Sequence, residues 1–190
     1  AILETWYAGE QQGTAIADAL TGKVNPGGKM PVSTARNVGQ LPNFYNYKPS
    51  ARRGYLFDET TPLFPFGWGL SYTTFNLAAP QLSASRIRAG EGVTVTVRVT
   101  NTGARAGDEV VQVYLRDEIS SVTRPVKELV GFKRVTLAPG ESRDVAIAIE
   151  PRAFGMWNAE MKRVTEPGTF AIMTGANSAE LQTVKLEVTP

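Results

Sequence analysis

The segment PLFPFGWGLSYTTF, residues 62–75, constrains the fold of this chain more than any other stretch. Its large apolar side chains recur at every second position: Phe64, Phe66, Trp68, Leu70 and Tyr72. On an extended backbone these side chains would share one face. Pro62 and Pro65 remove backbone donors, which argues against a helix or a central strand. Because each aromatic side chain can bury roughly 150–250 Å², we predict an extended strap packed between two folded bodies. Its aromatic residues should be largely buried, partly against protein outside this chain.

The composition is that of a globular protein of one or two domains, with 190 residues, 42% hydrophobic and 20% charged. The net charge is +2, and the basic residues are scattered rather than gathered in a stripe. This pattern gives no support to nucleic-acid binding. No apolar run reaches the roughly 18–20 residues that a membrane-spanning helix needs.

The chain contains neither cysteine nor histidine. This excludes disulfides, thiolate catalysis, a Ser-His-Asp triad and metal sites built on Cys or His. Carboxylates, Tyr, Lys, Ser and Thr remain for chemistry, and we expect no cofactor and no metal. The sequence opens on Ala-Ile-Leu without an initiator Met, so we expect it to be a piece of a longer protein.

Residues 1–42 resemble the end of an α/β unit. The pattern predicts a strand over Ala1–Tyr7, a short helix capped by Thr14, and Gly22 just past the helix end. A turn leads to a predicted edge strand over Lys29–Thr34. One helix and two strands are too few to bury a core, so this unit needs a partner.

The remainder of the chain divides into a linker and a β-rich domain. Residues 43–75 form a polar, Tyr-rich connection followed by the strap, and residues 76–190 contain short alternating runs separated by turns. The clearest run is Val93 to Val99, where valines alternate with Thr and Arg. Further runs are expected at 111–115, 129–137, 145–149, 170–173 and 184–188. About seven strands in about 115 residues predict an immunoglobulin-like or fibronectin III-like β-sandwich, so the chain as a whole is mostly β.

Without Cys or His, hydrolysis would need two carboxylates about 5–10 Å apart. Three adjacent pairs occur, Asp58-Glu59, Asp108-Glu109 and Asp117-Glu118, but neighbours on an extended chain point to opposite faces. We therefore interpret them as solvated loops or strand ends. Glu10 lies in a loop after the first predicted strand, where α/β proteins place their sites; alternatively, it complements the dipole of the following helix.

Four further residues are candidates for sugar binding. Arg52, Arg53 and Tyr55 would suit the rim of a site for hydroxylated rings, or they belong to a solvated linker. Trp157 is either a stacking platform for a sugar or a plug for the end of the sandwich core, and the plug is favoured. For the aromatic strap itself, packing fits the pattern better than ligand binding.

Four motifs in this order resemble the C-terminal third of the family-3 glycoside hydrolases, of the β-glucosidase and β-xylosidase type. They are WYAGEQQG (6–13), NPGGKMPV (25–32), the strap (62–75), and KELVGFKRV with LAPGES (127–142). The resemblance implies a (β/α)8-type barrel and the body of an α/β sandwich upstream of Ala1. Residues 1–42 would then be the tail of that sandwich, and residues 76–190 a fibronectin type III-like domain.

The resemblance also implies a function for the parent protein. Such enzymes are retaining exo-β-glycosidases acting on β-linked glucosides or xylosides, with an Asp nucleophile on the barrel and a Glu acid/base. Neither catalytic segment occurs in this sequence, so no catalytic residue is assigned here and Glu10 is not one. The expected role of the chain is to brace the enzyme, and a carbohydrate-binding or adhesion module is the alternative. A homodimer and a periplasmic or secreted location are compatible with the resemblance, and a cytoplasmic location stays open.

Overall fold

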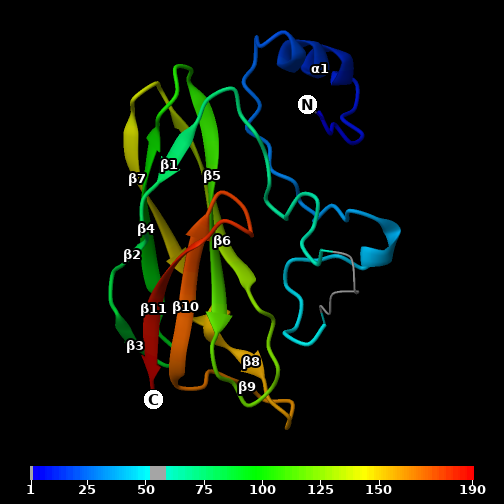
Figure 1. Ribbon diagram of the computed structural model, residues 1–190. Helices are drawn as coiled ribbons and strands as arrows, with labels where there is room; N and C mark the ends of the chain where they lie inside the picture. Colours follow the sequence, from blue (N-terminus) through cyan, green and yellow to red (C-terminus); the bar gives the residue numbers. More distant parts are fainter. Residues whose placement is uncertain (1, 52–58) are drawn as a thin grey trace.

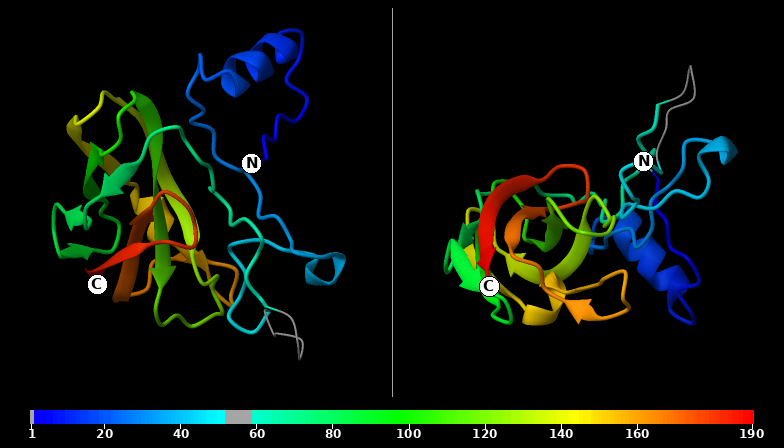
Figure 2. Two further views of the ribbon diagram at one scale, coloured as in Figure 1. Left: turned by 45° about the horizontal axis from the view of Figure 1, so that its top comes forward. Right: turned by 90° about the horizontal axis from the view of Figure 1, so that it is seen from below.

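The computed structural model describes residues 2–51 and 59–190. Two packed sheets form a β-sandwich from the residues that follow the strap (Figure 1). Helix α1 (Gln12–Leu20) and the 3₁₀ turn η1 (Val38–Gln40) belong to the N-terminal segment, which runs along one side of the sandwich (Figures 1 and 2). The sandwich confirms the predicted fold class.

The first sheet contains β1, β2, β4 and β7, and the second has the order β3-β11-β10-β5-β6. All pairings are antiparallel except β3 with β11. A separate hairpin pairs β8 with β9. The strand bounds are β1 Phe75–Leu77, β2 Gln81–Leu82, β3 Arg86–Arg88, β4 Val93–Asn101, β5 Gly107–Asp117, β6 Glu128–Leu137, β7 Ser142–Ile149, β8 Met156–Trp157, β9 Arg163–Val164, β10 Gly168–Gly175 and β11 Gln182–Thr189.

Strand β4 shows how the sequence pattern produces the core. Its four valines, from Val93 to Val99, are at most 4% exposed, whereas Arg98 on the opposite face is exposed. Facing residues of the second sheet, including Leu115 and Ile172, complete the core with no exposure. Alternation therefore places one face of each sheet in the core, as expected for aligned β-sandwiches.

Strand β5 departs from this alternation because both of its faces are covered. Val111, Val113 and Leu115 point into the core, but Gln112 and Tyr114 between them are also buried. Gln112 lies beneath the strap, where it donates to the Gly67 carbonyl, and Tyr114 packs edge-on against Tyr45 of the linker on the same outer face of the second sheet. The strap thus acts as a third layer over the middle of the sandwich.

Within the N-terminal segment the structure corrects three predictions. Residues 2–7 form no strand, since no neighbouring strand is present in the described chain to pair with them. Helix α1 begins at Gln12 with Gln11 at its N-cap, so Thr14 lies inside the helix. The segment 29–34 is not the predicted edge strand. It makes a single bridge, between Thr34 and Phe64, and its backbone hydrogen bonds go to the irregular strap rather than to a neighbouring strand. Gly22, with φ 75°, follows the helix as predicted.

The strap is also less regular than its alternation predicted. Gly67, with φ 79°, forms a turn in which the Trp68 amide donates to the Pro65 carbonyl over 3.1 Å. The turn breaks the single apolar face. Phe64 and Trp68 stack on each other with centroids 6.4 Å apart, whereas Phe66 stacks on Tyr45 at 4.3 Å. These three strap side chains are half-buried, but Leu70 and Tyr72 are exposed by 72% and 45%. The burial of Tyr72 against protein outside this chain stays a prediction.

Candidate functional site

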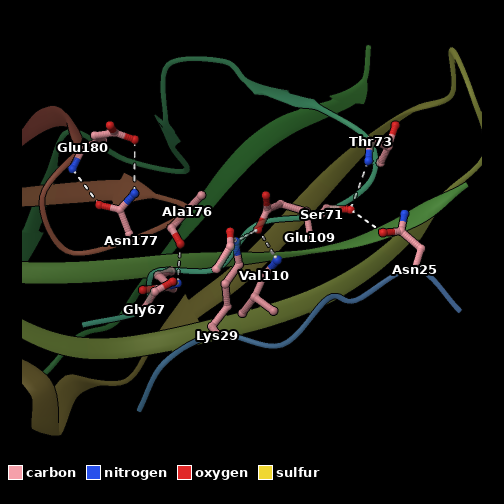
Figure 3. A network of polar contacts seen from close by, with 12 residues as sticks. Asn25, Lys29, Gly67, Ser71, Thr73, Glu109, Val110, Ala176, Asn177 and Glu180 are labelled. Atoms are coloured by element: carbon pink, nitrogen blue, oxygen red, sulfur yellow. Dashed lines mark hydrogen bonds and ion pairs between the residues drawn. The ribbon is translucent and has the colours of Figure 1, made fainter. Parts of the chain in front are cut away.

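A network of polar contacts lies where the segment Asn25–Met30 and the strap meet strand β5 (Figure 3). We call this region the strap junction. At its centre the Lys29 ammonium lies 2.7 Å from Glu109 Oε1, and the two side chains are only 14% and 8% exposed. Glu109 Oε1 also accepts the Val110 amide, and Lys29 donates to the Gly69 carbonyl over 3.3 Å. A buried ion pair that is also hydrogen-bonded on both sides fixes three segments to one another.

Asn25 makes the second link of the strap junction. Its Nδ2 donates to the Ala106 carbonyl over 2.9 Å, just before β5 begins. Its Oδ1 accepts the Ser71 hydroxyl at 2.9 Å and the Tyr72 amide at 2.7 Å. One side-chain amide therefore satisfies groups of both the strap and the sandwich, which specifies their relative position.

Gln112 makes the third link, beneath the turn of the strap. Its Nε2 donates to the carbonyls of Gly67, at 3.2 Å, and Ala176, at 2.7 Å. The Tyr114 hydroxyl donates to Gln112 Oε1 at 2.6 Å, and burial raises the pKa of Tyr114. A Cβ atom at Gly67 would overlap the Gln112 amide, so this approach requires glycine as well as a positive φ.

Tyr72 connects the strap to helix α1. Its hydroxyl donates to the Ala19 carbonyl over 2.7 Å, close to the C-terminal end of the helix. The Arg105 guanidinium lies 5.6 Å from the Tyr72 ring centroid and donates to the Gly22 carbonyl at 2.5 Å. The helix is therefore attached to the sandwich through hydrogen bonds and a cation–π contact rather than through a core, since none of its residues is buried.

Among the described residues, the pairs Asp108-Glu109 and Asp117-Glu118 do point to opposite sides, as predicted. Asp108 bonds to Arg134 at 2.8 Å, whereas Glu109 points the other way to Lys29. Hydrogen bonding from the Thr136 side chain, followed by Arg134, lowers the pKa of Asp108. The prediction that these carboxylates are solvated is wrong for Glu109, which is 6% exposed because the strap covers it.

Asp117 is the second carboxylate that proves to be buried. It lies at the end of β5 opposite Phe170, with its side chain 2% exposed, and contacts Arg124 at 3.4 Å. Burial raises its pKa, and the attraction of Arg124 offsets part of that rise. Arg124 also bonds to Glu128 at 2.8 Å. Pro49 and the loop 116–125 line a shallow pocket here, and Glu118 pairs with Lys185 on the outer face.

The remaining candidates are not brought together. Glu10 is exposed one residue before the N-cap of α1, far along the chain from the strap junction. Arg52, Arg53, Tyr55 and Asp58 lie outside the described residues, while Glu59 pairs with Arg36 at 2.9 Å. Among the described residues no group of three or more Asp or Glu side chains is arranged to hold a metal ion.

Trp157 occupies a different place from the one the sequence favoured. It is 61% exposed on β8, and Phe154, 1% exposed and edge-on to Phe170, fills the end of the core instead. Trp68 is half-buried against Phe64 in the strap. The preference for a core plug is therefore wrong for Trp157.

Sequence reasoning missed the polar residues of the strap junction. Asn25 and Lys29 entered only as parts of a motif, Glu109 only as a member of an adjacent carboxylate pair, and Gln112 was not singled out. A signal was present, because Gln112 and Tyr114 are larger than the three threonines that alternate with valines in β4. The hydrogen-bond partners of Lys29 and Gln112 in the strap, however, are 40 or more residues distant in the sequence.

Exposed apolar side chains are distributed unevenly along the chain. Among the described residues, thirteen large hydrophobic side chains are exposed between residues 2 and 72, but only four between 73 and 190. The thirteen are Ile2, Leu3, Trp6, Tyr7, Leu20, Val24, Val32, Val38, Leu41, Phe44, Leu63, Leu70 and Tyr72. The N-terminal segment therefore leaves far more of its large apolar side chains exposed than the sandwich does. None of the described helices is long and apolar enough to cross a membrane.

Two family models match different parts of the chain. The glycosyl hydrolase family 3 C-terminal domain matches residues 1–72, and a fibronectin type III-like domain matches residues 109–178. Among curated proteins, a beta-xylosidase of Formosa agariphila is 49% identical, with 98% of this chain and 27% of the relative covered. A periplasmic beta-glucosidase of Salmonella typhimurium is 45% identical, with 99% of this chain and 26% of the relative covered.

Solved structures agree with these matches. A β-glucosidase of Erythrobacter marinus superposes with a TM-score of 0.94 at 49% identity, covering 97% of this chain and 24% of that structure. A beta-glucosidase of Listeria innocua in complex with glucose gives 0.93 at 35% identity, covering 98% and 28%. The chain thus spans about a quarter of the length of its relatives.

Proposed function

Because the chain belongs to glycoside hydrolase family 3, where it matches the C-terminal part, we propose that it braces a retaining exo-β-glycosidase of β-linked glucosides or xylosides. Relatives along its whole length are named beta-glucosidases and beta-xylosidases. In this proposal the chain holds no catalytic residue. The nucleophile and the acid/base lie on the barrel and the body of the α/β domain, which are the partners of this chain.

The observation that carries the proposal is the contrast between the two halves of the chain. The sandwich buries a full core of its own, whereas the described part of residues 1–72 leaves thirteen large apolar side chains exposed. The rest of an α/β domain would cover these side chains. At roughly 25 cal/mol per Å² of apolar surface, such coverage would contribute much of the stability of that domain.

The strap junction explains how the sandwich would brace the α/β domain. Lys29, Asn25 and the strap residues are held by β5 and by the Ala106 carbonyl before it, all on the sandwich. The sandwich would thereby fix the loop and the helix that complete the α/β domain. Retaining hydrolysis needs two carboxyl groups about 5–5.5 Å apart, and loss of this support would disturb such a geometry.

The described carboxylates support a non-catalytic role. Glu109, Asp117, Glu118 and Asp108 each bond to a Lys or Arg, as described above. Each pair also points in two directions from its strand, so its two members cannot flank one glycosidic bond. A periplasmic location is proposed by analogy with the Salmonella relative, whose name states it.

The first test is hydrolysis by the 190-residue chain alone. We expect no release of 4-nitrophenol from 4-nitrophenyl β-glucoside or β-xyloside above the buffer rate. Turnover at the rate of a complete family enzyme would refute the non-catalytic role, and Glu10→Gln would then test the one candidate carboxylate that occurs in a family motif.

The second test concerns the brace in the full-length enzyme that carries this chain. Lys29→Met should lower the temperature of half-inactivation while leaving KM for the aryl glycoside at 20 °C unchanged. The matched control is Arg86→Met, which breaks the exposed pair with Glu187, 67% and 50% exposed. Equal inactivation temperatures for Lys29→Met and the wild type would contradict bracing.

A further inference from the structure

The hairpin of β8 and β9 has two chemically different faces. Met156 pairs with Val164, and Met156 is 7% exposed, so this face packs on the sandwich. Trp157 pairs with Arg163 on the other face, where both side chains are exposed. Because directly paired residues are neighbours on one face of a hairpin, the side chains of Trp157 and Arg163 extend from adjacent positions of the same small surface. Figure 1 places this hairpin at the end of the sandwich opposite α1.

The hairpin holds this surface rigidly. Phe154, two residues before β8, is 1% exposed and anchors the strand in the core. Asn158 Oδ1 accepts the amides of Glu160 and Lys162 at 3.1 and 2.9 Å. These bonds support Met161 in the left-handed region, with φ 59°, a conformation that costs energy for a residue with a side chain. An ordered turn of this kind fixes the backbone that carries Trp157.

Arg163 supplies hydrogen-bond donors at the edge of the indole. Its Nη2 donates to the Arg152 carbonyl over 2.6 Å, which fixes the guanidinium in place. Since a guanidinium carries five N–H donors, others stay available to a ligand. An exposed apolar ring beside fixed donors matches a pyranose, whose C–H face is apolar and whose rim carries hydroxyl groups.

From this geometry we propose that Trp157 and Arg163 form a binding platform for β-linked gluco- or xylo-oligosaccharides. The choice of sugar rests on the proposed function, whereas the existence of the platform rests on the hairpin alone. The site binds one or two sugar units of a longer chain and positions polysaccharide on the enzyme.

The size of the surface favours a sugar over a protein partner. The sandwich exposes only four large hydrophobic side chains among its described residues: Ile119, Phe132, Trp157 and Met161. Only Met161 shares the hairpin with Trp157. A stable protein interface needs about 800 Å² on each side. One indole offers roughly 150–250 Å², which suits a single sugar ring.

Native gel electrophoresis of the full-length protein tests the platform, with soluble xylan or hydroxyethylcellulose cast in the gel. We expect the polysaccharide to retard the wild type, and Trp157→Ala to weaken the association at least about tenfold, as expected for truncation of an aromatic anchor. Trp157→Phe should retain part of the retardation. Phe132→Ala is the matched control, because Phe132 is 66% exposed on the same sandwich, and it should migrate like the wild type.

Three results would overturn the platform: no retardation of the wild type, equal retardation of Trp157→Ala, or equal loss with Phe132→Ala. The first would also be the outcome if another part of the protein covers Trp157. Circular dichroism of each variant excludes misfolding as the cause. Hydrolysis of 4-nitrophenyl glycosides, measured in parallel, should be unchanged in all variants. If the wild type hydrolyses no 4-nitrophenyl glycoside, the proposed function is refuted, while the gel result still shows whether Trp157 binds polysaccharide.

Discussion

Replacing Lys29 by Met should open the strap junction, because it leaves the Glu109 carboxylate buried without its cation. At the observed 2.7 Å separation, Coulomb's law gives a gross attraction of about 6 kcal/mol for an effective dielectric constant of about 20. Much of this is offset by the cost of removing both charges from water. Removal of one partner from a buried pair typically costs about 3–5 kcal/mol.

Hydrogen exchange measures this loss locally. The Gly67 amide donates to the Met30 carbonyl and the Met30 amide to the Trp68 carbonyl, both at 2.8 Å. A loss of 3–5 kcal/mol should accelerate exchange of these two amides roughly 10²–10³-fold or more, at about 1.4 kcal/mol for each factor of ten. Amides of β4 and β7, on the opposite sheet, should change far less.

Two comparisons make the prediction refutable. Arg86→Met breaks an exposed pair and should cost no more than about 1 kcal/mol. The double variant Lys29→Met with Glu109→Leu should recover most of the lost protection, since an apolar pair avoids the buried charge. If Lys29→Met exchanges like Arg86→Met, or if the double variant is no better than the single one, the ion pair does not hold the strap.

Two further predictions concern stability. In urea unfolding, Gly67→Ala should lower the free energy of unfolding by about 1–3 kcal/mol more than Gly140→Ala. Both glycines have a positive φ, but only a Cβ at Gly67 would overlap Gln112. Equal effects would contradict a steric requirement for glycine at position 67. Burial raises the pKa of Asp117 above its ordinary 3.8, so the folded state retains a proton where the unfolded state has lost it. The free energy of unfolding attributable to this group is therefore greatest at or below pH 3.8 and declines as the pH rises through the elevated folded pKa. Asp117→Asn should flatten that part of the pH profile in thermal unfolding, and a profile identical to that of the wild type would contradict the assignment.

The sandwich was predictable from the sequence because its strands carry their own pattern. Val93 to Val99 alternate cleanly, and β4 occupies that run and two further residues. The runs that became β5, β6, β7, β10 and β11 were located in the same way. The strands of two or three residues, such as β2 and β8, were missed because alternation cannot be recognised over so few positions.

The N-terminal segment was poorly predicted because its secondary structure depends on neighbours. Residues 2–7 have a strand-like composition, but a strand forms only where another strand satisfies its amides. The alternation of the strap was real in sequence and broken in space by Gly67, whose turn is stabilised by Gln112 from a distant strand. Composition alone could not locate the ion pair of Lys29 and Glu109, since it joins positions 80 residues apart.

The covering of β5 on both faces has a consequence for how such chains can be recombined. The two family matches leave residues 73–108 between them, which makes this stretch the obvious place to exchange one domain for that of a relative. Yet Gln112 and Tyr114 on one side of that cut contact Gly67 and Tyr45 on the other. A chimera joined there would take the strap from one parent and strand β5 from the other, so the residues that contact each other would come from different sequences. A chimera should therefore take the segment 25–72 and strand β5 from the same parent, although the two family matches assign them to different domains.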